Sequence, residues 1–483
     1  MPVPVLSVAQ MRQWEEASWA AGRTQAEVIA RVGEKLASWL LRHSRLGDSI
    51  LVLAGKGHNG DDARATVPHL QGRTVTLLEV QDPAQALAAL EAALAQQPRW
   101  ILDGLFGIGL NRPLNEAWRH FIERINVASR RVVSVDVPSG LDADSGEVRG
   151  AAVSAAVTLT LGAPKRGLLH PAAAVHTGRL EVIPDIGLIP CPIGEDLQWT
   201  LPGDFEAWPP LRPVGAHKGT FGHLAILAGS LGYHGAAVLT ARAAQRARPG
   251  LITLCTTPQA YAAVAGQLQA VMVRPWLPDS RPPERLTAWL IGPGLAGTDV
   301  SRELIETVVQ IWQEATEPVV VDASALDWLP AGAVPACRIR VLTPHPGEAA
   351  RLLRCSPAEV QADRVSALRK LSEQYGHAWV VLKGHQTLIG RSTGPVYVNC
   401  SGNPGLAQGG SGDVLAGYLA GFLAQPLLQQ DLCQLVRYAV WQHGAVADHL
   451  GAVHPSWIVE DLVARLGQVS PFEKNDATHF LHA

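Results

Sequence analysis

Short apolar runs alternate with amphipathic stretches through the first half of the chain. Runs typical of buried strands occur at 49–54, 74–80, 100–102, 132–137 and 156–161, and helical periodicity occurs at 8–42, 83–95 and 115–128. Such alternation predicts an α/β domain with a mostly parallel sheet covered by helices. Ligands of these sheets bind beyond the carboxyl ends of the strands, so we expect a site at the loops after Ala54, Leu102 and Val137.

The periodicity stops at 189–216, where six prolines accumulate, and a second α/β series follows. Its predicted strands are 224–228, 251–256, 289–291, 318–322, 340–342 and 378–382, and its predicted helices are 236–248, 300–314, 357–375, 413–423 and 432–450. The proline-rich segment marks a domain boundary, which we place between 1–205 and 206–483. The polar tail from Pro471 is expected to be frayed.

Composition narrows the classes of function. Of the 483 residues 47% are hydrophobic and 17% are charged, which suits two large folded cores. The net charge of -3 gives no chain-wide reason to expect nucleic acid or an anionic membrane as a partner. Without a membrane-length apolar run or a signal-peptide pattern, we expect a cytoplasmic protein. Six scattered cysteines without a CxxC pair suit reduced thiols rather than disulfides or a structural metal.

One glycine-dense turn carries the clearest chemical signal. The segment 403–413 ends in Gly-Gly-Ser-Gly-Asp413 and opens a predicted helix. Free amides at the N-terminus of a helix bind phosphate. Because a carboxylate beside such a cradle repels the ligand, Asp413 is better explained as a base that takes a proton from a hydroxyl during phosphate transfer. The alternative is a plain turn with Asp413 as the N-cap of the helix.

Four more loops have a composition that suits phosphate transfer, namely 229–235, 292–294, 343–348 and 383–387. Lys383 and Thr387 supply a cation and a hydroxyl for phosphate oxygens. His345 lies between two prolines, and a capping or packed histidine is an equal alternative there. The chain has only seven lysines, and ligand contact is favoured for some of the four in such motifs, which are Lys56, Lys165, Lys218 and Lys383.

From about residue 210 to 465, the order and spacing of these motifs resemble the carbohydrate-kinase-like, ADP-dependent dehydratase family that repairs hydrated NADH and NADPH (NADHX and NADPHX). The resemblance implies a ribokinase-like fold. It also implies that the C6 hydroxyl of the hydrated ring is phosphorylated by ADP, with Mg²⁺, and that phosphate is then eliminated. The matching segments are 217–219, 228–237, 291–294, 322–326, 342–348, 381–384, 402–413 and 443–445.

The same resemblance implies roles for individual residues. Asp413 is the catalytic base, and Ala236 or Ala237, Gly294, His345 and Asp413 line the hydrated nucleotide. The residues implied for the adenylate of the donor are Lys383, Gly384, His385, Gln386, Thr387 and Gly412. The usual Asp-Ala-Asp is Asp322-Ala-Ser324 here, so the contribution of the second carboxylate is open. Without the resemblance, a small-molecule kinase of the same fold is the alternative.

Residues from about 8 to 188 resemble the companion epimerase family, which interconverts the two C6 epimers, and this implies a Rossmann-like three-layer domain. The match rests on 103–110, 135–144, 165–168 and 185–187. It implies K⁺ bound by Asn59, Asp103 and Ser139, with Asp136 as a catalytic residue. The implied substrate contacts are His58, Asn59, Gly60, Asp61, Asp62, Gly107, Ile108, Gly109, Leu110, Asn111, Arg112, Pro113 and Asp136.

The glycine loop of this first half departs from the family pattern. The family has Gly-x-Gly-Asn-Asn-Gly-Gly-Asp-Gly, whereas 55–63 is Gly-Lys-Gly-His-Asn-Gly-Asp-Asp-Ala. Aspartate or alanine at a glycine position of positive φ would be strained, and Asp61 beside Asp62 adds negative charge near dinucleotide phosphates. We expect a folded first domain with retained or reduced epimerase activity, and a non-catalytic interaction module is the alternative. A homo-oligomer is also expected, although its size is open.

Overall fold

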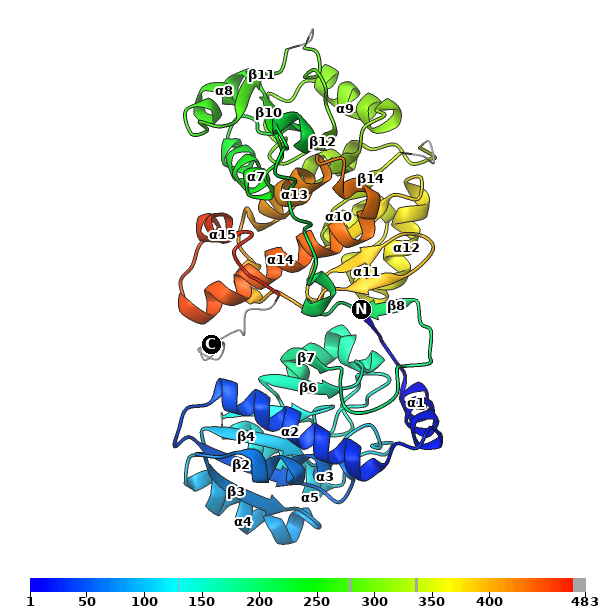
Figure 1. The fold of residues 1–483 in the computed structure, drawn as a ribbon, viewed down its shortest axis with the longest axis vertical. Helices are drawn as coiled ribbons and strands as arrows, with labels where there is room; N and C mark the ends of the chain where they lie inside the picture. The colour runs from blue at the N-terminus through cyan, green and yellow to red at the C-terminus, as the bar shows by residue number, and fades with distance from the viewer. Residues whose placement is uncertain (129, 278–279, 335–337, 472–483) are drawn as a thin grey trace. The chain divides into compact units, whose positions relative to one another are not determined.

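The computed structural model describes residues 1–128, 130–277, 280–334 and 338–471. Apart from Pro471 itself, the tail expected to be frayed lies outside these residues, as does Cys337. The chain forms two compact units (Figure 1), one of residues 2–201 and one of Met1 with the described residues from Pro202 to Pro471. Each unit has its own sheet and its own buried core.

Residues 2–201 form a three-layer α/β unit around a six-stranded parallel sheet of order β3-β2-β4-β5-β6-β7. Apolar side chains of α1, α2 and α3 pack on one face of the sheet, and those of α4 and α5 pack on the other. The strands are β2 (Ser49–Ala54), β3 (Thr74–Glu79), β4 (Trp100–Gly104), β5 (Arg131–Val135), β6 (Val157–Leu161) and β7 (Arg179–Ile183). The helices are α1 (Val8–Ala20), α2 (Gln25–His43), α3 (His58–Thr66), α4 (Pro83–Ala95), α5 (Glu116–Val127) and α6 (Ala174–Thr177), and β1 (Val3–Pro4) pairs with β8 (Leu197–Trp199).

The second unit is built on a sheet of order β17-β16-β15-β14-β13-β12-β9-β10-β11, in which all pairings are parallel except those of β16 with β15 and with β17. Its strands are β9 (His223–Leu227), β10 (Leu251–Thr256), β11 (Met272–Pro275), β12 (Ala288–Ile291), β13 (Val319–Val321), β14 (Arg340–Leu342), β15 (Trp379–Leu382), β16 (Leu388–Gly390) and β17 (Val396–Val398). Its helices are α7 (His234–Ala247), α8 (Pro258–Ala265), α9 (Arg302–Glu314), α10 (Pro346–Leu353), α11 (Pro357–Ala362), α12 (Arg364–Gln374), α13 (Ser411–Leu423), α14 (Leu432–Val453) and α15 (Val459–Arg465).

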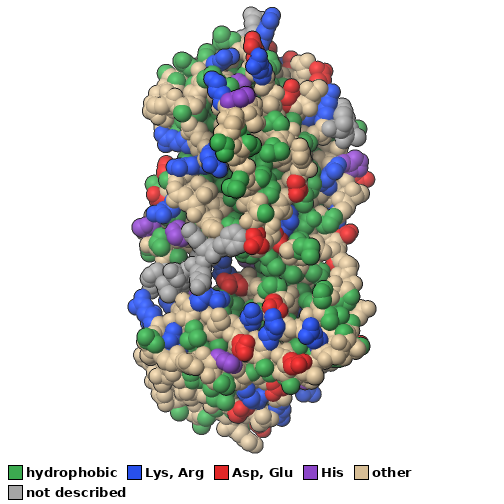
Figure 2. Space-filling model, viewed as in Figure 1, with side chains coloured by type: hydrophobic (Ala, Val, Ile, Leu, Met, Phe, Trp, Pro, Cys, Tyr) green, Lys and Arg blue, Asp and Glu red, His purple; other side chains and the backbone are tan. Residues whose placement is uncertain are grey.

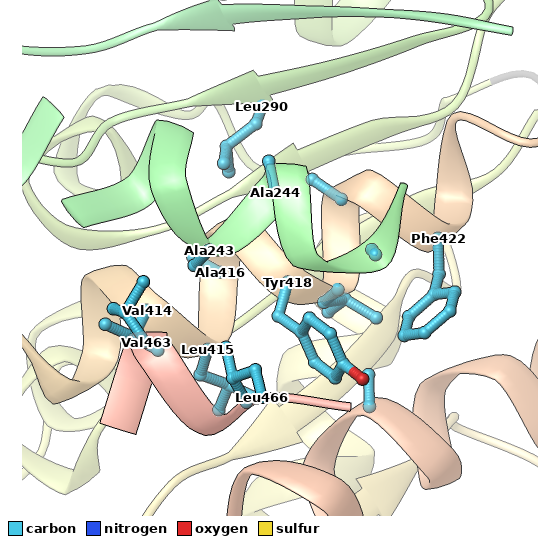
Figure 3. Packing of buried hydrophobic residues seen from close by; sticks show 14 of the residues in the cluster. Ala243, Ala244, Leu290, Val414, Leu415, Ala416, Tyr418, Phe422, Val463 and Leu466 are labelled. Atoms are coloured by element: carbon cyan, nitrogen blue, oxygen red, sulfur yellow. The ribbon is translucent and has the colours of Figure 1, made fainter. Parts of the chain in front are cut away.

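Two helices in the core of this unit pack unusually closely. Small side chains of α7, such as Ala243 and Ala244, face α13, where Leu415, Ala416 and Tyr418 are buried (Figure 3). Gly417 of α13 permits this approach, because a Cβ there would lie 2.2 Å from the carbonyl oxygen of Thr240 on α7. The position of α13, and of any site at its N-terminus, therefore depends on a glycine contact inside the core.

The sequence predicted the α/β class correctly, and several element boundaries were wrong. The single helix expected at 8–42 is two helices, because Thr24 caps α2 with a capping box to Glu27. The helix expected at 357–375 is also two, since the Asp363 side chain caps α12. The helices α3 and α10 were missed, since glycine and proline at their starts hide the helical periodicity.

The surface shows no extended field of one charge on the face drawn in Figure 2, where basic and acidic side chains lie interspersed. Within the described ranges, no helix combines the length and the apolar character needed to cross a membrane.

Candidate active sites

Asp413 lies in the first turn of α13 and does not cap it. The N-cap is Gly410, whose φ of 95° is left-handed and which makes no side-chain cap hydrogen bond. The alternative in which Asp413 caps the helix is therefore wrong. Because the first amides of a helix have no intrahelical acceptor, the turn before Asp413 provides donors for an anion.

Three more charged groups surround the Asp413 carboxyl. Lys383 Nζ lies 2.7 Å from Asp322 Oδ1 and 3.7 Å from Glu348 Oε2. Burial raises the pKa of Asp413 to about 7, the charge of Asp322 adds to the rise, and Lys383 opposes it. Burial alone would lower the pKa of Lys383, but Asp322 and Glu348 hold it above its ordinary value. The cluster thus combines a permanent cation with a carboxyl that titrates near neutrality.

The loops that follow β9 and β12 come together through Ser230. Its hydroxyl donates to the Gly294 carbonyl at 2.6 Å and accepts from the Gly297 amide at 2.7 Å. Gly294 has a φ of 66°, and a Cβ there would lie 2.9 Å from the Ala236 Cβ. Ala236 is therefore beside Gly294, whereas Ala237 is fully buried in the core. The structure favours Ala236 as the surface-facing member of the pair.

His345 is the N-cap of α10, which confirms the alternative of a capping histidine. Its Nδ1 accepts from the amides of Gly347 at 3.0 Å and Glu348 at 3.3 Å, and the Glu348 carboxylate accepts from the His345 amide at 2.7 Å. The cap fixes the ring while leaving about half of the side chain exposed. The same helix start thus places Glu348 beside Lys383.

The 383–387 loop divides into two parts. Lys383 points to the Asp413 cluster, and its Nζ lies 3.4 Å from where a Cβ on Gly412 would be. The rest of the loop is held by Arg364, whose guanidinium donates to the carbonyls of His385 and Gln386. Burial lowers the pKa of Arg364 to about 10. Arg364 was not predicted as a site residue, because it lies in a helix without a recognisable motif.

Helix α14 holds the glycine loop in front of Asp413. His443 Nε2 lies 3.0 Å from the Ser411 carbonyl oxygen, and the Asp448 carboxylate accepts from the Gly402 amide at 3.0 Å. Burial lowers the pKa of His443 to about 4, so the ring is neutral at neutral pH and Nε2–H donates to the carbonyl. The segment 443–445, noted only as a motif match, therefore positions the turn.

In residues 2–201, a cavity of about 760 Å³ opens where the sequence predicted the first site. The predicted residues that line it are His58, Asn59, Asp62, Gly107, Ile108, Gly109, Leu110, Asn111, Arg112 and Asp136. Gly60, Asp61 and Pro113 are not in its wall. Glu15 and Lys165 also line it and were not among the predicted site residues. The scarcity of lysine in the sequence had marked Lys165 as a candidate for ligand contact. Nothing in the sequence distinguishes Glu15 from other acidic residues on an amphipathic helix.

Asp136 is held in a strained position at the end of β5. Its φ of 64° is left-handed, a conformation that costs a non-glycine residue about 1–2 kcal/mol. The fully buried Lys165 forms an ion pair with Asp136. Oδ1 of Asp136 also accepts from the Leu161 amide at 2.9 Å and the Thr160 hydroxyl at 3.2 Å. The carboxylate is thus fixed at the cavity wall.

Asp103, Ser139 and Asn59 meet around a second buried carboxylate. Asp103 is fully buried and accepts from the Ser139 hydroxyl at 2.6 Å and the Ser134 hydroxyl at 2.8 Å. Asn59 Nδ2 donates to the Phe106 carbonyl at 2.9 Å, and the Phe106 amide donates to the Ser139 hydroxyl oxygen at 2.9 Å. Among the described residues no lysine, arginine or histidine forms an ion pair with Asp103. An oxygen-rich cluster around an uncompensated carboxylate fits a monovalent cation.

The expected strain at the altered glycine positions is absent. Asp61 and Ala63 lie within α3, and neither has a positive φ. Ala63 is fully buried and packs against Gly104 of β4. The added charge of Asp61 is also compensated, because its carboxylate lies 2.8 Å from Arg64 outside the cavity wall. The local conformation therefore gives no reason for a reduced activity.

Both halves of the chain match known protein families. The model of the family described as NAD(P)H-hydrate dehydratase matches residues 224–465, and that described as YjeF-related protein N-terminus matches residues 25–167.

Similar proteins extend the match to most of the chain. A bifunctional NAD(P)H-hydrate repair enzyme Nnr of Coxiella burnetii is 36% identical over 468 residues, which cover 91% of this chain and 93% of the relative. The enzyme of the same name from Escherichia coli is 34% identical over 493 residues, covering 96% and 93%. A solved ADP/ATP-dependent NAD(P)H-hydrate dehydratase from Bacillus subtilis, co-crystallised with ATP and Mg²⁺, is 30% identical, with a TM-score of 0.49 over 55% of this chain and 95% of its own.

Proposed function

Because this chain belongs to the family of bifunctional NAD(P)H-hydrate repair enzymes, we propose that it restores NADH and NADPH from their hydrates with two activities. Residues 1–205 are proposed to interconvert the two C6 epimers, and residues 206–483 to dehydrate one of them with ADP. The division into compact units between Leu201 and Pro202 is consistent with this assignment. The substrates are therefore NADHX, NADPHX and ADP.

The Asp413 carboxyl, with its pKa of about 7 at the start of α13, carries the dehydratase proposal. In its ionised form Asp413 takes the proton of the C6 hydroxyl while that oxygen bonds to the terminal phosphorus of ADP and AMP leaves. Phosphate then leaves C6 with the bonding electron pair, and C5 loses a proton as the C5=C6 bond forms. The glycine-turn amides and Lys383 stabilise charge on the moving phosphoryl group.

The remaining contacts follow from the placement of the loops. We propose that Ala236, Gly294 and His345 line the hydrated nucleotide, together with Asp413. Ala237 supports this wall from the core. The 383–387 loop and Gly412 hold the donor, and Lys383 serves the phosphates because its ammonium lies in the Asp413 cluster.

Mg²⁺ fits this site as a companion of the nucleotide. The described residues contain no cluster of three or more His, Cys, Asp or Glu side chains arranged as a metal site. Asp322 and Glu348 are near the phosphoryl position, but each is already engaged by Lys383. Mg²⁺ would therefore be held mainly by phosphate oxygens and water, and it would neutralise their charge when bound.

For the first unit we propose Asp136 as the base of an epimerase site. Its fixed carboxylate in the wall of a large cavity supports this role. Asn59, Asp103 and Ser139 would hold K⁺, which would offset the buried charge of Asp103 and stiffen the loop over the cavity. The interaction-module alternative does not explain why a strained, ion-paired carboxylate lines the cavity.

A direct test compares Asp413→Asn with the wild-type chain on the (6S)-hydrate of NADH. We expect ADP-dependent recovery of the dihydronicotinamide absorbance to fall by about 10²–10⁴-fold, the usual contribution of a general base. Glu306→Gln, at an exposed acid on α9 that pairs with Arg302, serves as the matched control. A kinase would consume ADP, yield a stable phosphorylated product and restore no absorbance. Unchanged recovery in Asp413→Asn would reject the proposed role.

A further inference from the structure

The epimerase cavity contains a base without an assigned partner acid. Lys165 Nζ donates to Asp136, to the Leu161 carbonyl at 2.9 Å and to Thr160 Oγ1 at 3.3 Å. Its three protons are therefore all engaged, and its side chain is fully buried. Lys165 orients Asp136 but has no proton to give to a substrate.

Only one oxygen of Asp136 is occupied in this network. The donors Lys165, Leu161 and Thr160 all bond to Oδ1. No residue in 1–128 or 130–201 donates a hydrogen bond to Oδ2. Since Asp136 lines the cavity, Oδ2 is the atom available to accept a substrate proton.

Asp62 is the buried acid that faces the same cavity from another element. It lies on α3, its exposure is 8%, and no described residue forms a hydrogen bond or an ion pair with its carboxyl. Burial raises its pKa well above the ordinary value, and the charges of Asp136, Asp61 and Glu15 add to the rise while Lys165 opposes it. Burial and these charges therefore favour the protonated form of Asp62, whereas the Asp136 carboxylate is paired with Lys165.

We propose that Asp62 is the general acid that works with Asp136 in the epimerase site, and that Lys165 is the positioning residue of Asp136. The inference rests on the proposed epimerase function. It assigns separate chemical roles to two carboxyl groups of one cavity, as the opposite environments of the two groups require.

The chemistry of the substrate calls for such a pair. C6 of the hydrated ring carries a hydroxyl and is bonded to the ring nitrogen N1, so it is a hemiaminal carbon. Asp136 Oδ2 takes the hydroxyl proton, the C6=O bond forms, and the C6–N1 bond breaks while Asp62 protonates N1. Rotation about C5–C6 exposes the other face of the aldehyde. Ring closure then returns one proton to Asp62 and takes the other from Asp136, so no oxidant or co-reactant is consumed.

Glu15 is the competing candidate for the acid. It lines the cavity from α1, and burial also raises its pKa, but Lys165, His58 and Arg12 oppose the rise. Glu15 is also less buried than Asp62. Asp136 adds to the rise for Glu15, so the pKa values of both acids are raised, and the deeper burial of Asp62 is the reason that we assign the acid to Asp62.

The test follows epimerisation of pure (6S)-NADHX without ADP, by chromatography, on the full chain between pH 5 and 9. The wild type should show a bell-shaped profile. Asp62→Asn should lower the catalysed rate by about 10²–10⁴-fold and remove the alkaline limb. Lys165→Met should lower kcat more than it raises KM for the hydrate, because Asp136 loses the group that orients it. Asp62→Glu should recover part of the rate.

Controls separate this inference from a folding defect. Glu16→Gln, an exposed neighbour of Glu15, should match the wild type. Asp62→Asn should unfold at no lower temperature, because an amide replaces an unpaired buried carboxyl. If Asp62→Asn stays within about twofold of the wild type, or if Glu15→Gln removes the alkaline limb, the assignment of Asp62 is wrong. An inactive wild-type chain would instead reject the epimerase proposal itself.

Discussion

Asp413 and Asp136, the two proposed bases, lie in opposite environments. Asp413 is destabilised as an anion, since burial and Asp322 raise its pKa to about 7. Asp136 is stabilised as an anion by Lys165, and its backbone strain keeps it at the cavity wall. The first arrangement makes the proposed base of the dehydratase site sensitive to pH near neutrality, whereas the second fixes the position of the proposed base of the epimerase site.

The pKa of Asp413 predicts how dehydration depends on pH. The base must be ionised, so kcat at saturating hydrate and Mg-ADP should rise as pH increases and reach half of its plateau near pH 7. Asp413→Asn should show no such rise. This pH dependence of kcat is measured from the initial rates of absorbance recovery between pH 5.5 and 9. A kcat that is constant across this range would contradict the assignment of Asp413.

Individual site residues were predictable to different degrees. Motif spacing located Asp413, Lys383 and Asp136 because each follows a strand or opens a helix. The missed residues, among them Glu15 and Arg364, act through tertiary contacts between segments distant in sequence. Nothing in a local pattern distinguishes such a residue from an exposed acid or base on a helix.

At the scale of elements, hydrophobic periodicity located strands and long helices but missed their interruptions. Strands 49–54, 251–256 and 340–342 agree with β2, β10 and β14 residue by residue. Helix breaks are determined by side-chain caps such as Thr24 and Asp363, which leave the apolar pattern almost unchanged. Helix α3 was hidden because its sequence was interpreted as a glycine loop.

The packing of α13 on α7 makes Gly417→Ala a sensitive change. The new Cβ would meet the Thr240 carbonyl oxygen at 2.2 Å, so the helices must separate, at a cost of about 1–3 kcal/mol. Asp413 lies on the same helix, so dehydratase activity should fall as well. Denaturant unfolding gives the change in free energy of unfolding.

Gly235→Ala on α7 is the matched control. No atom outside its local chain lies within 4 Å of the added Cβ, so this change should stabilise the unit by about 0.4–1 kcal/mol. Equal effects of the two substitutions on unfolding would contradict the close-packing argument.

At the scale of the whole molecule, two separate cores allow the two activities to be supplied by different chains. We expect an equimolar mixture of Asp136→Asn and Asp413→Asn chains to repair (6R)-NADHX with ADP, because the epimerised hydrate diffuses from one chain to the other. Neither variant alone should repair the (6R)-hydrate faster than its spontaneous epimerisation allows. Absorbance recovery measures this complementation. Failure of the mixture would show that the hydrate must pass between sites of one chain.

The two-part α/β organisation was also the most predictable property of the whole chain. A change from periodic to proline-rich sequence at 189–216 brackets the division that the structure places between Leu201 and Pro202. Family membership is confirmed by relatives that match the chain almost end to end. Sheet order was not predictable, because nothing in the apolar runs specifies which strands are neighbours.

The left-handed backbone at Asp136 has a consequence for how such sequences change over time. Glycine would relax this position at once, and asparagine would keep its shape while removing the charge. Either change, however, would leave the fully buried ammonium of Lys165 without its ionic partner, which typically costs about 3–5 kcal/mol. Position 136 is therefore not free to change by itself, and a lineage that lost its carboxylate would also have to replace Lys165.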